Sequence, residues 1–97
     1  LIGFRLRPRA RRDMSAILFY IGQRESPCGF DRRDEMFRIF EILGEMPEAG
    51  TGHEEVGIGI RMFPKGNYVI LYEAVQDGII VVRVVHAARD RQQMVLR

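Results

Sequence analysis

The chain has little of several residues from which functional sites are commonly built. Cys28 is its only cysteine, so no disulfide can form within the chain, and a reducing compartment such as the cytoplasm fits. The only histidines, His53 and His86, lie far apart and make no zinc-binding pattern with a single cysteine. We therefore expect neither a metal nor a cofactor.

Long apolar runs are missing as well. No stretch approaches the roughly 20 apolar residues of a membrane-spanning helix, and we expect no signal peptide before the first predicted strand. We expect no membrane association and a cytoplasmic protein. A chain of 97 residues, 46% of them hydrophobic, can bury one modest core without disulfides or metals. A single domain over residues 1–97 follows as an expectation.

Lysine is almost absent, since Lys65 is the only one and every other basic side chain is arginine. Arginine favours planar, bidentate contact with carboxylates, phosphates or base edges. The charge is also uneven. Residues 1–33 carry eight arginines against three acids, residues 34–60 carry seven acids against one arginine, and residues 61–97 are basic again. This asymmetry predicts a charged partner, although solvated helix faces that happen to segregate would give the same pattern.

The first half of the chain predicts a strand followed by two helices. Residues Ile2–Arg7 alternate apolar and polar, and Pro8 suits the first turn of a helix that runs to about Gln23. A second helix begins at Ser26-Pro27, or a few residues later because of Gly29, and ends near Gly44. The apolar stripes are Ala10, Met14, Ile17, Leu18 and Ile21 in the first helix, and Met36, Phe37, Ile39, Phe40, Ile42 and Leu43 in the second. We expect an antiparallel hairpin in which the second helix contacts both the sheet and the first helix.

The second half predicts a loop over Glu48–Gly57 and then three strands, Ile58–Phe63, Tyr68–Glu73 and Ile79–His86. The connections are the short turn "PKGN" and a hairpin at Asp77-Gly78, the dipeptide that most favours a tight turn. The order is β-α-α-β-β-β. We therefore predict an α+β fold in which the helical hairpin packs on one face of a mostly antiparallel sheet.

Strand alternation sorts the predicted sheet into two faces. If Asp77-Gly78 forms the two-residue turn, Tyr72 lies opposite Arg83. The face with Ile58, Ile60, Met62, Val69, Leu71, Val82 and Val84 is then expected under the helices. The other face is expected to be an open binding surface with the candidate partner-binding residues Arg61, Phe63, Tyr68, Tyr72 and Arg83. Two alternatives stay open: the arginines pair with acids such as Glu73 or stack on tyrosines, or a bulge sends Arg61 and Arg83 to opposite faces.

Three segments of the sequence, in their order and spacing, resemble the ParE/RelE toxin superfamily of bacterial type II toxin–antitoxin systems, and its ParE branch in particular. The segments are "RPRARRDMSAILFYI", "EILGEMPEAG" and "GIRMFPKGNYVILYEAVQDGIIVVRVVHAARD", which together span nearly the whole chain. Arg89 is among the matching residues and joins the candidate partner-binding group. Two departures weaken details of the match: Arg7 stands where the family often has a capping serine, and no basic residue follows Gly50 in the loop.

The resemblance implies the fold predicted above and a toxin neutralised by a small antitoxin encoded beside it. ParE-like members poison DNA gyrase, whereas RelE-like members cleave mRNA on the ribosome. Family antitoxins cover the toxin with apolar anchors and acidic residues. A toxin homodimer and a toxin–antitoxin hetero-oligomer both fit.

The residues favour inhibition over catalysis. Arg61 and Arg83 are the alternative catalytic pair, because they could stabilise charge at a phosphate. However, no tyrosine follows Tyr72, Lys65 stands alone in a turn, and a general acid and base are missing. We therefore predict inhibition of DNA gyrase by protein–protein binding, with no catalytic residue. The alternatives are a RelE-like, ribosome-dependent mRNA endonuclease and an inactive toxin that only binds its antitoxin.

Overall fold

The computed structural model describes residues 3–24, 29–52 and 57–88. The elements in chain order are β1 (Gly3–Leu6), α1 (Pro8–Arg24), α2 (Gly29–Glu45), the 3-10 helix η1 (Pro47–Ala49), β2 (Thr51–Gly52), β3 (Ile60–Lys65), β4 (Tyr68–Val75) and β5 (Gly78–His86). The predicted α+β order is confirmed, with the short 3-10 helix η1 and the strand β2 added to it. The segment predicted as a loop over Glu48–Gly57 contains the two-residue strand β2, which pairs with β3.

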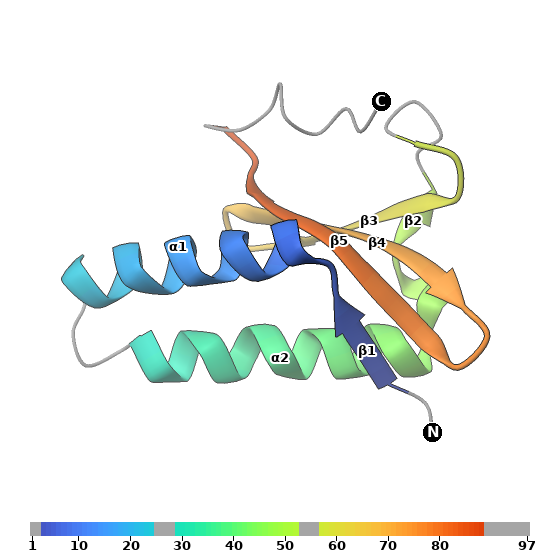
Figure 1. The fold of residues 1–97 in the computed structure, drawn as a ribbon, viewed down its shortest axis with the longest axis horizontal. Helices are drawn as coiled ribbons and strands as arrows, with labels where there is room; N and C mark the ends of the chain where they lie inside the picture. Colours follow the sequence, from blue (N-terminus) through green and yellow to red (C-terminus); the bar gives the residue numbers. More distant parts are fainter. Residues whose placement is uncertain (1–2, 25–28, 53–56, 89–97) are drawn as a thin grey trace.

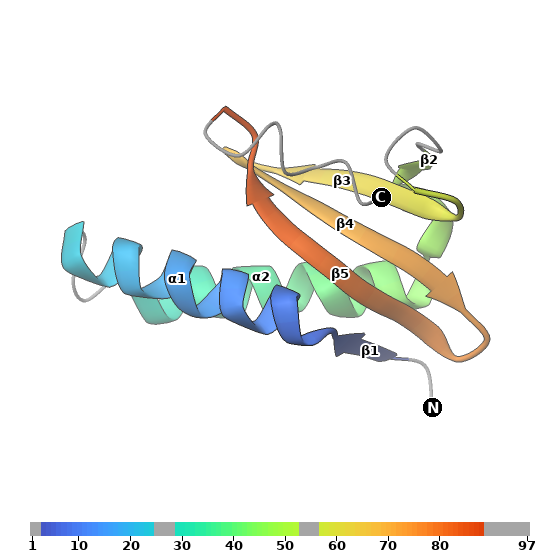
Figure 2. The same cartoon turned by 45° about the horizontal axis from the view of Figure 1, so that its top comes forward.

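The sheet has five strands in the order β1-β5-β4-β3-β2. β1 runs parallel to β5, and the other neighbours are antiparallel. Both helices cover the same face of the sheet and lie side by side in opposite directions (Figures 1 and 2), which confirms the predicted hairpin. Among the described residues no helix is both long and apolar enough to cross a membrane.

The helical stripes predicted from sequence form the core beneath the sheet. α1 buries Ala10, Met14 and Ile17, and α2 buries Met36, Phe40 and Leu43. The rings of Phe4 in β1 and of Phe37 and Phe40 in α2 lie with their centroids 5.3–5.7 Å apart. α2 therefore contacts β1 and β5 as well as α1, as predicted. Among the stripe residues whose burial is described, Ile42 is the exception, since it is 42% exposed; the side chain of Ile21 lies outside the described part.

The strand register differs from the predicted one. The β4–β5 hairpin turns at Gln76-Asp77, because Val75 pairs with Gly78, and Tyr72 pairs with Val81 rather than with Arg83. A bulge between Leu71 and Tyr72 then leaves Val82 as the extra residue of β5, so that Arg83 pairs with Leu71. Tyr72 and Arg83 therefore belong to opposite faces of the sheet, and the prediction that they share one is wrong.

The predicted orientation of the sheet is also wrong. Arg61, Phe63, Tyr68 and Tyr72 do share a face in β3 and β4, but that face packs against the helices. The aliphatic face is the helix-free one, and its core cluster consists of Ile60, Val69, Leu71, Val82 and Val85. Because both faces are apolar, the number of aliphatic side chains does not determine which one the helices cover.

Candidate functional site

Arg83 is buried and bound to an acid of helix α1. Its Nε donates to Oδ2 of Asp13 at 2.7 Å, and its Nη2 donates to Oδ1 at 3.0 Å. The side chains of Arg83 and Asp13 are only 6% and 16% exposed. Such a bidentate pair fixes both partners in one geometry. Arg83 therefore joins β5 to α1, and the prediction that it points from an open binding face is wrong.

Asp13 also protects the edge of the sheet. β1 pairs with β5 only as far as Val81, where the carbonyl accepts the N–H of Arg7. Beyond that point no strand of the described residues pairs with β5 on this side, and the N–H of Val84 donates instead to Oδ2 of Asp13 at 3.0 Å. A carboxylate thus replaces a neighbouring strand, which satisfies a buried backbone donor at an otherwise open edge.

Arg61 and Tyr72, opposite each other in β3 and β4, hold the chain's own loop. The hydroxyl of Tyr72, whose residue is fully buried, accepts the N–H of Gly50 at 2.8 Å and donates to the carbonyl of Pro47 at 2.5 Å. Nη2 of Arg61 donates to the carbonyl of Gly50 at 2.6 Å and to that of Glu48 at 3.3 Å. These two side chains therefore anchor the segment that contains η1 and leads into β2.

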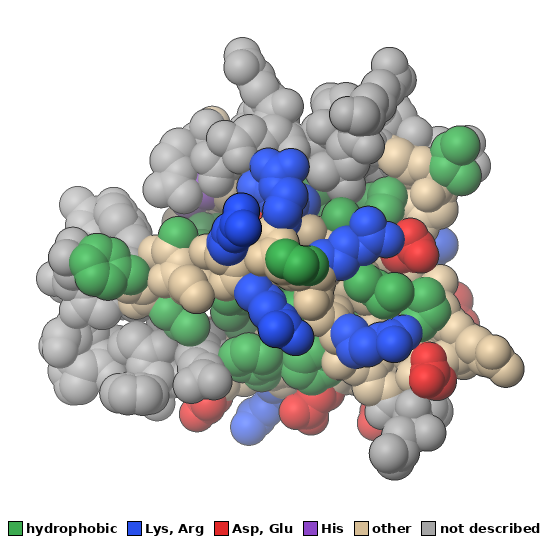
Figure 3. Space-filling view, viewed as in Figure 1, with side chains coloured by type: hydrophobic (Ala, Val, Ile, Leu, Met, Phe, Trp, Pro, Cys, Tyr) green, Lys and Arg blue, Asp and Glu red, His purple; other side chains and the backbone are tan. Residues whose placement is uncertain are grey.

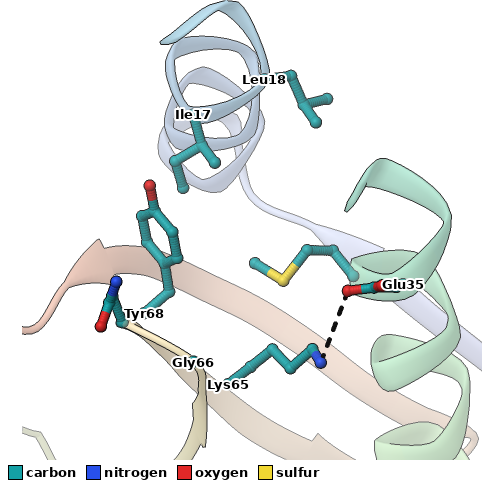
Figure 4. A pocket seen from close by; sticks show the side chains of 8 residues that line it. Ile17, Leu18, Glu35, Lys65, Gly66 and Tyr68 are labelled. Atoms are coloured by element: carbon teal, nitrogen blue, oxygen red, sulfur yellow. Dashed lines mark ion pairs between the residues drawn. The ribbon is translucent and has the colours of Figure 1, made fainter. Parts of the chain in front are cut away.

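Tyr68 lines a small pocket between α1, α2 and the turn that joins β3 to β4. The tyrosine ring points toward Ile17 of α1, and Lys65 reaches across to Glu35 of α2 at 3.7 Å (Figure 4). The pocket volume is about 160 Å³, well below the ~300 Å³ at which sites for drug-sized ligands begin. The ring of His86 meets Tyr68 edge-on at 5.3 Å. This pocket fits water or a single small side chain better than a substrate.

The six candidate partner-binding residues therefore do not form one surface. Tyr72 and Arg83 are interior, Arg61 contacts the loop, and Phe63 and Tyr68 are half-buried against the helical core. Arg89 lies outside the described residues. Their common placement on an open face is wrong, whereas their contribution to partner binding stays a prediction.

Sequence reasoning missed Asp13, although a signal was present. Asp13 lies three residues after Ala10 and four before Ile17, so it shares the helical stripe that faces the sheet. An acid in an apolar stripe indicates a buried cation or backbone donor nearby. Among the described residues, no group of three or more histidine, cysteine or acidic side chains could hold a metal ion.

The uneven charge predicted from the sequence appears in the structure as a basic surface. The arginines at positions 5, 7, 9, 11 and 12 are all exposed, on β1, at its junction with α1 and in the first turns of α1. Figure 3 shows Lys and Arg side chains gathered over these two elements on one side of the molecule. The uneven charge of the sequence thus becomes a surface feature, and we call these five residues the arginine face.

Comparison with known proteins yields a family and a fold. Residues 4–91 match the family model of the ParE toxin of the type II toxin–antitoxin system parDE. Among solved structures, the chain is similar to one from the chromosomal ParDE toxin–antitoxin system of P. aeruginosa, with a TM-score of 0.71 and 14% sequence identity over 88% of this chain and 95% of that chain. At this identity the similarity shows the fold alone. No match is found among curated proteins.

Proposed function

From the premise that the chain belongs to the ParE toxin family of type II toxin–antitoxin systems, we propose that it is a toxin that inhibits DNA gyrase by binding it in the cytoplasm. A cognate antitoxin neutralises it by covering the gyrase-binding surface. The observation that carries this proposal is the family match, which extends from β1 past the end of β5 and so includes every described element.

The placement of the two alternative catalytic arginines supports inhibition over mRNA cleavage. A nuclease needs cations and proton-transfer groups gathered around one phosphorus atom. Arg83 is bound to Asp13, while Arg61 donates to the carbonyls of Gly50 and Glu48. The two arginines also belong to opposite faces of the sheet. Neither is placed to share a substrate with the other.

Exposed apolar side chains support a protein partner. Ile42 and Met46, one turn apart at the end of α2, are 42% and 58% exposed, and Phe19 on α1 is 68% exposed. Large apolar side chains on the surface of a small domain are commonly the anchors of protein–protein contacts. A gyrase subunit and an antitoxin are both partners that would cover them.

Assays on one purified protein distinguish a gyrase inhibitor, an mRNA endonuclease and an inactive toxin. We expect the toxin to inhibit DNA supercoiling by gyrase and to produce gyrase-dependent DNA breaks, both relieved by the antitoxin, while mRNA on translating ribosomes stays intact. Ribosome-dependent mRNA cleavage without an effect on gyrase would overturn the proposal in favour of the endonuclease. Tight antitoxin binding without either activity would identify an inactive toxin.

A further inference from the structure

The arginine face carries five positive charges that little else in the described structure balances. Glu73 lies 3.8 Å from Arg7, but both side chains of this pair are at least a third exposed, so the contact is weak. Asp77 lines a shallow pocket together with Arg5, and no ion pair between the two is seen among the described residues. The first turn of α1 holds no acid. Asp13, the only acid of α1, has its carboxylate turned toward Arg83 and Val84. The face therefore presents nearly its full charge to solvent.

We propose that the arginine face binds the phosphate backbone of double-stranded DNA without reading its sequence. Guanidinium groups bind phosphate oxygens through paired N–H donors, and several of them along a duplex supply most of the affinity in non-specific binding. A toxin bound to DNA in this way would meet gyrase on the same DNA on which gyrase acts. Phosphate binding is a property beyond the proposed function. The choice of DNA rather than RNA as the ligand rests on the proposed function, because gyrase acts on DNA.

The surroundings of the arginines favour a polyphosphate over an acidic protein segment. A peptide partner needs large apolar anchors among the charges to hold it. The apolar side chains next to the arginines, Phe4 and Leu6, are partly buried against the core. The strongly exposed ones of the described residues lie elsewhere, at Phe19, Ile42, Met46 and Ile58. The five arginines come from β1, its junction with α1 and the start of α1, where Lys and Arg side chains are spread over a broad surface (Figure 3). A duplex offers charges of one sign at regular spacing, which suits such a surface.

The experiment uses fluorescence anisotropy with a short labelled DNA duplex of mixed sequence, titrated with the full chain at several salt concentrations. The test variant combines Arg9→Gln, Arg11→Gln and Arg12→Gln. We expect its log–log salt slope to fall by about 0.9 per arginine, and its affinity to drop on the order of a hundred-fold at about 0.1 M salt. No ion pair joins these three side chains to another described residue, so an unchanged unfolding midpoint should accompany the loss.

The matched control is Arg38→Gln, an exposed arginine on α2 near the acids Asp34, Glu35 and Glu41, which should keep wild-type DNA affinity. Equal loss in both variants would overturn the proposal. Tighter binding to an RNA duplex, or binding to polyglutamate in place of DNA, would overturn it as well. If the toxin inhibits gyrase but does not bind DNA, only the DNA-binding proposal is wrong. If it binds DNA but does not inhibit gyrase, only the proposed function is wrong.

Discussion

At the scale of single residues, one carboxylate satisfies three donors. Oδ1 and Oδ2 of Asp13 accept from Nη2 and Nε of Arg83, and Oδ2 also accepts the N–H of Val84. Replacing Asp13 with alanine would remove the carboxylate that pairs with a guanidinium only 6% exposed. We expect Asp13→Ala to lower the free energy of unfolding by about 3 kcal/mol, as measured by urea denaturation.

The control for this prediction is Asp34→Ala, because Asp34 is an exposed acid on α2 and should change stability by less than about 0.5 kcal/mol. Combining Asp13→Leu with Arg83→Met should recover much of the loss, since an apolar pair of similar volume often replaces a buried ion pair without penalty. If Asp13→Ala is as stable as Asp34→Ala, the pair does not hold α1 to the sheet.

Tyr72 gives a second residue-scale prediction. Its hydroxyl joins the N–H of Gly50 to the carbonyl of Pro47 from a fully buried position. Tyr72→Phe keeps the ring but leaves both backbone groups without this partner, so we expect a loss of about 2 kcal/mol and faster hydrogen exchange at the Gly50 amide. Tyr68→Phe is the control, because no hydrogen bond of its hydroxyl is seen within the described part of the chain. Equal exchange rates in the two variants would contradict the role of Tyr72.

The same residues explain why an arginine in an apolar strand was misread. The sequence "VVRVV" indicates that Arg83 lies among buried positions. An arginine at such a position can point from a binding face or pair with a buried acid, and the strand pattern is the same in both cases. The acid lies 70 positions away on α1, so no local pattern connects the two. Arg83→Ala should therefore reduce stability, and any loss of toxicity in that variant would follow from the fold.

At the scale of elements, β1 is held by close backbone contacts with two glycines. A Cβ on Gly44 of α2 would lie 2.6 Å from the carbonyl oxygen of Gly3, and a Cβ on Gly78 would overlap the backbone of Gly3. Gly78 also has a φ of 141°, which disfavours other residues. β1 can therefore pack between α2 and the start of β5 only because both positions lack a side chain.

Because of this contact, we expect a glycine-to-alanine substitution in α2 to lower the stability of the fold rather than raise it. Glycine to alanine within a helix ordinarily stabilises by about 0.5–1 kcal/mol, but we expect Gly44→Ala to destabilise by about 1–3 kcal/mol because β1 has to shift. Gly52→Ala is the control, since its nearest contact would be Nη1 of Arg61 at 3.9 Å. Unfolding curves would decide, and a stabilised Gly44→Ala variant would show that β1 is not confined by α2.

Elements were easier to predict than their register. Apolar stripes at helical spacing placed both helices, and Pro8 placed the start of the first, because those signals are local. The faces of the sheet depend on a single position: moving the turn from Asp77-Gly78 to Gln76-Asp77 and adding a bulge at Val82 changes which residues share a side. Nothing in the sequence of β5 marks Val82 as the extra residue, because it stands in a run of valines.

At the scale of the whole molecule, charge separates two surfaces. The arginine face covers β1 and the start of α1, whereas α2 presents the exposed acids Asp34, Glu35, Glu41 and Glu45. The exposed apolar side chains of Ile42, in this acidic helix, and of Met46, directly after its last residue, lie apart from the arginine face. A phosphate backbone and a protein partner anchored by apolar contacts would therefore use different parts of the surface.

This separation predicts that antitoxin binding and DNA binding respond to different substitutions. A ligand that binds only the native state at about 100 times its Kd stabilises it by about 2.7 kcal/mol, which for a domain of this size raises the unfolding midpoint by about 10 °C or more. We expect the antitoxin to produce such a shift in the wild-type toxin. The variant with Arg9→Gln, Arg11→Gln and Arg12→Gln should keep most of the shift, as measured by thermal denaturation over a series of antitoxin concentrations, because apolar anchors supply most of the energy of protein contacts. A shift that disappears together with DNA affinity would mean that both partners compete for the arginine face.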